Sequence, residues 1–175
     1  ADIHNELLEI VLNAGTPATA NADKTVHQGV EATLSLETSR WRVQGSYLWN
    51  DFRFHHDAVF GNNRIAGLPS QVLGLEVAFR LSNQIWLGPT VQAASHSWVD
   101  HANTTKAPGY SIYGLKVGQK LIGNISWFLE GRNLTNKNYV ATTGVVRDMS
   151  SLGVNQAQFN PGDGRSVFMG ISKQL

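Results

Sequence analysis

The sequence predicts an all-β fold, namely an antiparallel up-and-down β-barrel that crosses a membrane with its strands. Apolar and polar residues alternate with a period of two along most of the 175 residues, as expected of strands with one apolar face. Short turns and long polar loops alternate between these segments, which is the layout of an outer-membrane barrel. Asp, Glu, Lys and Arg make up only 15% of the residues, against roughly 25% in a typical soluble domain.

About eight segments carry the alternation, and each is expected to form one strand. The clearest apolar rows are the even positions of residues 26–36, the odd positions of 41–49 and the odd positions of 73–81. The later segments repeat the pattern more loosely. The expected strands lie near residues 3–12, 25–37, 40–54, 70–82, 85–99, 110–121, 125–139 and 165–175.

The connections fall into two classes. Short turns are expected at 38–39, 82–84 and 122–124, and long loops rich in Gly, Asn and Pro at 13–24, 55–69, 100–109 and 140–164. A strand of about eleven residues, tilted by about 40°, rises roughly 28 Å along the membrane normal, close to the apolar band of about 25 Å in such barrels. A soluble β-sandwich or lipocalin-like barrel would alternate equally well. Its outer face should be dense in Lys and Glu, however, whereas the polar faces here are mainly Gly, Ser, Thr and Gln.

The composition excludes several other classes. The net charge is +1 and no cluster of Lys and Arg indicates nucleic-acid binding. The absence of Cys excludes disulfides, Cys-based zinc sites and thiol catalysis. No apolar run approaches the roughly twenty residues of a membrane-spanning helix.

Five short motifs follow one another along the chain. They are NADKTVHQGVEATL at 21–34, GNNRIAGLPSQVLGLEVAFR at 61–80, APGYSIYGLKVG at 107–118, FLEGRNLTNKNYV at 128–140 and FNPGDGRSVFMGIS at 159–172. In this order they resemble the C-terminal barrel of TonB-dependent outer-membrane receptors.

The resemblance implies that residues 1–175 are a barrel segment from the outer membrane of a Gram-negative bacterium, without the plug domain and TonB box of such receptors. It implies a receptor rather than an enzyme. Such a receptor imports a metal chelate, for example a ferric siderophore, as cargo and needs no cofactor. The expected partners are outer-membrane lipid, the chelate and, only through the missing plug region, the TonB complex. Such receptors have about twenty-two strands. The alternative is a complete small barrel of about eight strands, either a lipid-modifying enzyme or a structural or adhesion protein.

Candidate ligand contacts are few. His55 and His56 lie in a long loop, where they could help to recruit a metal chelate, although ordinary loop polarity explains them as well. Adjacent His on a strand edge should point to opposite sides, and the spacing of His96 and His101 fits no helical ligand pair, so no metal site is predicted. No catalytic residue is predicted either, because the sequence contains no G-x-S-x-G elbow.

Five charged residues are expected on the lumen face, where they can form a ladder of ion pairs that stiffens the wall. For the arginines among them, Arg132 in particular, contact with an anionic ligand or with a plug is the functional alternative. The five residues are Glu76, Arg80, Lys116, Glu130 and Arg132.

Ligand selectivity is expected in the loops 55–69 and 140–164, because binding residues concentrate in loops on a rigid scaffold.

Overall fold

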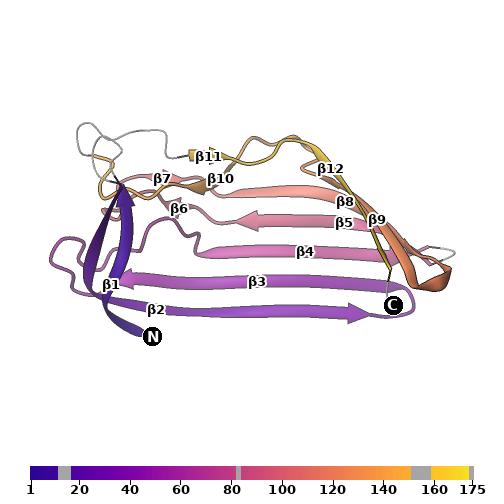
Figure 1. Cartoon of the computed structure of the whole chain (residues 1–175), viewed down its shortest axis with the longest axis horizontal. Coiled ribbons are helices and arrows are strands. Elements are labelled where there is room, and N and C mark those ends of the chain that lie inside the picture. Colours follow the sequence, from indigo (N-terminus) through magenta and orange to yellow (C-terminus); the bar gives the residue numbers. More distant parts are fainter. Residues whose placement is uncertain (12–16, 82–83, 151–158, 174–175) are drawn as a thin grey trace.

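One antiparallel sheet of eight strands forms most of the structure, a computed structural model that describes residues 1–11, 17–81, 84–150 and 159–173. The prediction of an all-β antiparallel fold is therefore confirmed. In spatial order the strands are β1 (Asp2–Val11), β2 (Pro17–Glu37), β3 (Trp41–Phe54), β4 (Gln71–Arg80), β5 (Ile85–Ala94), β8 (Tyr110–Lys120), β9 (Ile125–Arg132) and β12 (Ser166–Lys173) (Figure 1).

The sheet is open. Over the described residues its edges are β1 and β12, which pair only with β2 and β9 respectively. Figure 1 shows β9 and β12 turning away from the plane of β3, β4 and β5, and β1 turning away at the other edge. Of the two forms that the sequence left open, the small closed barrel does not match the described sheet, which is not closed.

Short turns and long loops lie at opposite ends of the sheet. The turns after β2, β4 and β8 lie at one end, here called the turn end, and the connections after β3, β5 and β9 lie at the other, the loop end (Figure 1). Two small hairpin-like sheets belong to the loop end. They consist of β6 (Ser97–Trp98) with β7 (Lys106–Ala107), and β10 (Val140–Thr143) with β11 (Phe159–Pro161).

Three boundaries differ from the sequence prediction. The fifth strand, expected at 85–99, ends at Ala94. Residues 17–24 were expected in a loop, but they form the first part of β2 and pair with β1, for example Lys24 with His4. The seventh expected strand ends at Arg132 and not at 139. Asn133 and Asn136 have positive φ angles of 48° and 52°, a left-handed conformation that ends a strand and makes a turn.

The register of the sheet brings the apolar rows onto one face, here called the outer face. Val30 pairs with Trp49, and Val43 pairs with both Leu36 and Val77, without interruption from β2 to β4. Large side chains on this face are widely exposed, with values of 57% for Val30, 71% for Val167 and 74% for Met169. The apolar rows thus do not form an internal core.

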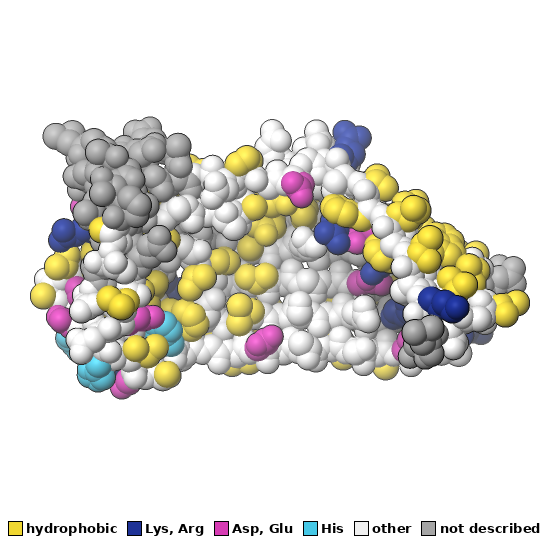
Figure 2. Space-filling model, in the orientation of Figure 1, with side chains coloured by type: hydrophobic (Ala, Val, Ile, Leu, Met, Phe, Trp, Pro, Cys, Tyr) yellow, Lys and Arg dark blue, Asp and Glu magenta, His cyan; other side chains and the backbone are white. Residues whose placement is uncertain are grey.

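The opposite, polar face carries Gly, Ser, Thr and Gln together with charged side chains such as Glu76, Lys116, Glu130 and Arg132. Figure 2 looks onto this face, which is mainly white in the middle; most of the visible Lys and Arg lie toward the turn end, whereas Asp and Glu lie toward both ends. A buried apolar cluster lies instead at the loop end, where Ala22, Phe54 and Ile65 pack with Leu8 and Phe60. Across the described ranges, no helix has the length and apolar character needed to cross a membrane.

Candidate functional site

The loop end is built from three loops that pack on one another. These loops, here called the loop layer, comprise residues 55–69 after β3, 95–109 after β5 and the described part of 140–164. Gly67 N donates a hydrogen bond to Trp98 O at 2.8 Å, and Val146 N donates one to Val99 O at 3.1 Å. Val99 and Val146 are buried, so the layer has an interior of its own.

Asparagine side chains join the first two loops through hydrogen bonds to backbone groups of the other loop. Asn103 Oδ1 accepts a hydrogen bond from Arg64 N at 2.9 Å, and Asn103 Nδ2 donates one to Arg64 O at 2.9 Å. Asn63 Nδ2 donates to His101 O at 3.0 Å. These bonds cross almost forty residues of sequence, so loop 55–69 and loop 95–109 act as one unit.

Asp100 is the polar centre of the layer. Its carboxylate is fully buried and accepts hydrogen bonds from Thr104 N, Thr104 Oγ1 and Thr105 N at 3.0, 2.6 and 3.0 Å. It also accepts one from Met149 N at 3.2 Å, in the third loop. Several donors offset the loss of hydration of a buried charge. Asp100 therefore orders the loops.

His101 lies beside it and is only 2% exposed. Its Nδ1 accepts a hydrogen bond from Ala66 N at 3.3 Å, and its ring meets the edge of Phe54 at a centroid distance of 5.2 Å. Burial lowers the pKa of His101 to about 4, against the opposing effects of Asp100 and Asp57. The imidazole is therefore neutral near pH 7 and acts as a packed, hydrogen-bonded part of the layer.

At the same end, the polar face carries an aromatic pair. The rings of His27 and Phe52 are stacked at 4.4 Å with an angle of 15° between them. Glu6 Oε2 accepts a hydrogen bond from Thr25 Oγ1 at 2.5 Å and lies 3.1 Å from His27 Nε2. This arrangement offers a flat π surface next to a carboxylate. Sequence reasoning missed it because β1 and β2 had to pair before Glu6 could reach His27.

The predicted candidates His55 and His56 lie at the loop end, next to β2. His55 N donates a hydrogen bond to Lys24 O at 2.9 Å, and His56 N donates one to Asn62 Oδ1 at 3.0 Å. The expectation that the two side chains point apart is wrong. His56 has a left-handed φ of 53°, which breaks the strand alternation, so the ring centroids lie 4.3 Å apart with the two Nδ1 atoms in contact.

Arg132 lies elsewhere on the sheet. Its Nε and Nη2 donate to the two carboxylate oxygens of Glu130 at 2.8 and 2.9 Å, and its guanidinium lies 4.4 Å from the Phe168 ring centroid. Strands β4, β5 and β8 separate β9 from β3, so Arg132 is about 19 Å from the His55 strand along the sheet. The structure does not bring these candidates together.

The predicted charge ladder on the polar face is present. Lys116 Nζ reaches over β5 to Glu76 Oε2 at 2.7 Å, and together with the Glu130–Arg132 pair these residues line a cavity of about 400 Å³. Arg80 differs from the expected pairing. Its guanidinium lies 4.5 Å from the centroid of the Trp86 ring and 3.9 Å from Glu37.

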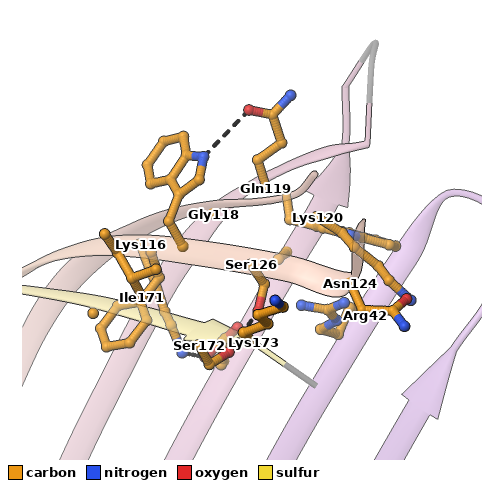
Figure 3. Close-up of a pocket in the computed structure, with 16 residues that line it drawn as sticks. Arg42, Lys116, Gly118, Gln119, Lys120, Asn124, Ser126, Ile171, Ser172 and Lys173 are labelled. Atoms are coloured by element: carbon orange, nitrogen blue, oxygen red, sulfur yellow. Dashed lines mark hydrogen bonds and ion pairs between the residues drawn. The ribbon is translucent and has the colours of Figure 1, made fainter. Parts of the chain in front are cut away.

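A second cavity, of about 620 Å³, lies at the turn end of the polar face. Figure 3 shows Arg42, Lys120, Asn124 and Lys173 close together along it, with Trp127 Nε1 donating to Gln119 Oε1 at 3.3 Å nearby. The cavity is lined by more cations than anions. Throughout the described ranges, no group of three or more His, Asp and Glu is placed to hold a metal ion.

Two of the sequence motifs form one clip at the loop end. Asn133 is buried, its Nδ2 donates to Lys137 O and Asp163 O at 2.9 Å each, and its Oδ1 accepts from Lys137 N at 2.8 Å. Gly162 packs against the ring of Tyr139, where a Cβ would come within 2.0 Å of Cζ. The clip ties the end of β9 to the chain that enters β12, so its residues are structural.

Comparison with known proteins gives a consistent result. Residues 2–134 match the family described as "TonB dependent receptor-like, beta-barrel". The chain is 30% identical over 143 residues to the ferrioxamine receptor of Yersinia enterocolitica, covering 75% of this chain and 20% of that protein. It thus spans about a fifth of the length of this curated relative.

Solved structures share the fold at lower identity. The siderophore receptor PiuA of Acinetobacter baumannii superposes with a TM-score of 0.67 at 19% identity, over 93% of this chain and 23% of that one. The ferric yersiniabactin uptake receptor FyuA of Yersinia pestis gives 0.66 at 16% identity, over 88% and 24%. The copper transporter OprC gives 0.70 at 14% identity, over 97% and 26%.

Proposed function

The chain belongs to the TonB-dependent receptor family, and we propose that it supplies wall strands and outward-facing loops to a receptor for a metal chelate such as a ferric siderophore. Membership places it in the outer membrane of a Gram-negative bacterium. In this proposal the loop end faces the outside of the cell and the turn end faces the periplasm. TonB would act through a plug region that residues 1–175 do not supply, and the metal would be cargo.

The exposed outer face is the observation that carries the proposal. A continuous face of Val, Leu, Trp, Met and Ile is unfavourable in water but suits the hydrocarbon region of a bilayer. The opposite face is polar and lined with paired charges, as the wall of a water-filled or plugged lumen would be. This division supports a membrane-spanning barrel wall.

The open sheet argues against the alternative of a complete small barrel. Such a barrel needs its first and last strands to pair, and β1 and β12 are not neighbours in the described sheet. A lipid-modifying enzyme would also need a reactive group near a membrane edge. At the loop end, the side chains of Asp100, Asn103 and Asn133 are engaged in ordering loops, so receptor function is the better-supported proposal.

The cargo is proposed from the named relatives. A ferrioxamine receptor, a siderophore receptor and a ferric yersiniabactin receptor support a ferric chelate. The copper transporter has the same fold, so fold alone does not select the metal.

We place the chelate contacts at the loop end. The stacked His27 and Phe52 present a flat surface on the polar face, suited to an aromatic or amide-bearing part of a chelator. His55 and His56 would add contacts from the loop next to β2, and Arg132 would attract an anionic chelate from β9. These residues line separate parts of one mouth.

Uptake by living cells tests the proposal. A strain that lacks the receptor would be complemented with the intact receptor and supplied with radioactive iron as ferrioxamine, a ferric catecholate or ferric citrate. We expect energy-dependent accumulation from at least one chelate, abolished when TonB is deleted. Phe52→Ala should reduce accumulation, whereas Phe79→Leu on the outer face should not. Normal amounts of receptor without uptake of any chelate would contradict the proposal.

A further inference from the structure

Two arginines lie directly opposite each other on the outer face, just beyond its apolar rows. Arg53 is near the end of β3, and Arg64 in the following loop pairs with it in an antiparallel bridge. The pairing of β3 with β2 is uninterrupted, so Arg53 shares the face of Tyr47 and Trp49. Residues that are directly opposite in an antiparallel pair project to the same face, so Arg64 shares it as well.

One carboxylate orders both arginines. Arg53 Nε donates to Asp51 Oδ1 and Oδ2 at 2.7 and 2.8 Å, and Arg64 Nη2 lies 3.0 Å from Asp51 Oδ1. Gln28 Nε2 donates to Asp51 Oδ2 at 3.4 Å. The acceptors of Asp51 are therefore occupied, and its side chain is only 12% exposed. The two guanidinium groups are held in place rather than free to turn away.

The cluster has one positive charge in excess. Two guanidinium groups share one carboxylate, and like charges directly opposite on a sheet are unfavourable without a further anion. The side chains of Arg53 and Arg64 are 43% and 32% exposed, which leaves N–H donors accessible from outside. A phosphate group has several oxygens and can accept hydrogen bonds from both guanidinium groups at once.

The position relative to the apolar rows selects the class of anion. Arg53 is four residues beyond Trp49, so it lies about 10 Å farther along the normal of a tilted sheet. That height corresponds to headgroups rather than acyl chains. Val26 pairs with Arg53 and so lies beside the charges, and Val30, which pairs with Trp49, belongs to the apolar face below them. A phosphate joined to acyl chains would gain both contacts, whereas free phosphate would gain only the ionic one.

We propose that Arg53 and Arg64, ordered by Asp51, bind the phosphate of an anionic lipid of the outer leaflet, such as a phosphorylated glycolipid. The inference rests on the membrane orientation given under the proposed function, but it does not depend on the cargo. It gives this edge of the receptor a preferred lipid neighbour.

Native mass spectrometry of the intact receptor in detergent tests the inference with two matched lipids. We expect lipid A to remain bound, and its fully dephosphorylated form to bind at least tenfold more weakly. Equal retention of both lipids would overturn the proposal. Inorganic phosphate at millimolar concentration is a separate arm: if it binds the same arginines as well as lipid A does, the site is one for free phosphate and the lipid assignment is wrong.

Variants locate the site. Arg53→Gln and Arg64→Gln should each weaken lipid A binding about fivefold, and the double variant about 30-fold, as expected of one favourable charge each at an anionic surface. Arg42→Gln, on the polar face at the turn end, is the matched control and should retain wild-type binding. Wild-type binding by the double variant would overturn the proposal. If the double variant fails to fold, the comparison of the two lipids on the unmodified receptor still decides the question. Chelate uptake is measured separately, so failure here leaves the proposed cargo function to its own test.

Discussion

At the scale of single residues, amide and carboxylate side chains link the loops of the loop end to one another. Asn103 and Asn63 bridge two loops through backbone groups, and Asp100 gathers donors from two loops around one buried charge. Such bonds are directional, so they fix the relative positions of loops that share only a small apolar interior. Any ligand contacts at the mouth would therefore sit on an ordered base.

Asn103 gives a prediction about this base. Asn103→Ala removes the bonds to Arg64 N and Arg64 O and places Ala at a φ of 57°, where a Cβ is unfavourable. We expect the loop layer to open more easily by about 2–4 kcal/mol. Asn103→Gly removes the same bonds without the backbone penalty and should cost about 1 kcal/mol less. Hydrogen exchange of amides in 55–69 and 95–109 measures both effects. Unchanged exchange in both variants would show that Asn103 does not join the loops.

His101 gives a second prediction, which concerns the stability of the loop layer as the pH falls. Burial lowers its pKa from 6.5 to about 4 in the folded protein, so the unfolded or opened loop takes up a proton first as the pH falls. The stability of the loop layer should be complete above about pH 6.5 and should decline toward pH 4, by up to roughly 3 kcal/mol. The nearby carboxylates of Asp100 and Asp57 oppose this lowering of the pKa of His101.

A variant isolates the histidine from these carboxylates. His101→Gln cannot take up a proton, so it should lose the part of the acid sensitivity that belongs to the imidazole. The measurement is the difference in loop hydrogen exchange between wild type and variant at about pH 7 and about pH 4.5. Identical pH profiles for the two proteins would count against a neutral buried His101.

At the scale of strands, the two faces of β4 provide a direct comparison. Val77 lies on the outer face, paired with Val43, and the adjacent Glu76 lies on the polar face, 2.7 Å from Lys116. Val77→Arg should destabilise the inserted barrel by roughly 2–4 kcal/mol if the residue is near the midplane. Glu76→Gln keeps a hydrogen-bond acceptor and should cost less than about 1 kcal/mol. Folding into detergent or lipid, followed by urea titration, measures both. Equal tolerance of the two substitutions would contradict the assigned faces.

The strands also show what sequence can and cannot predict here. The rows on β2, β3 and β4 follow from residues two apart, so the alternation alone located them, and the register then aligned them. The start of β2 was missed because PATANADK at 17–24 contains turn-forming residues, and its strand depends on pairing with β1. The loop layer was missed for a related reason. Asn103 and Arg64 are 39 residues apart, and no local pattern signals their contact.

Functional residues were harder to predict than strands. His55 and His56 were placed correctly in a long loop, but the left-handed His56 brings their rings together, which alternation could not reveal. Arg132 was correctly expected on the polar face with Glu76, Lys116 and Glu130, yet it lies across the sheet from the histidines. The local sequence predicts on which face of the sheet a strand residue lies. The grouping of residues into a site depends on which strands become neighbours.

At the scale of the whole molecule, the two unpaired edges of the described sheet determine whether residues 1–175 can form a membrane barrel by themselves. In the bilayer core, every backbone N–H and C=O needs a partner, and each unpaired group costs several kcal/mol. In the described sheet β12 pairs on one side only, with β9, so inserting this sheet by itself would leave a row of backbone groups in lipid. Closing eight strands instead would require β1 to pair with β12, although β1 pairs with the part of β2 nearest the loop end. We therefore predict that residues 1–175, expressed alone with an outer-membrane targeting signal, form no stable monomeric barrel in the membrane.

The measurement is the heat-dependent shift in electrophoretic mobility that folded outer-membrane barrels show, together with the native mass of the extracted protein. The intact receptor should give the shift, and the isolated 19.1 kDa chain should not, because its edges lack partners. Lys173→Ala at the end of β12 is a useful companion, since it removes a charge from the edge without supplying a pairing strand and so should not rescue folding. A folded monomer of 19.1 kDa from the isolated chain would show that β1 and β12 can close, and it would revive the small eight-stranded barrel as the better description of the protein.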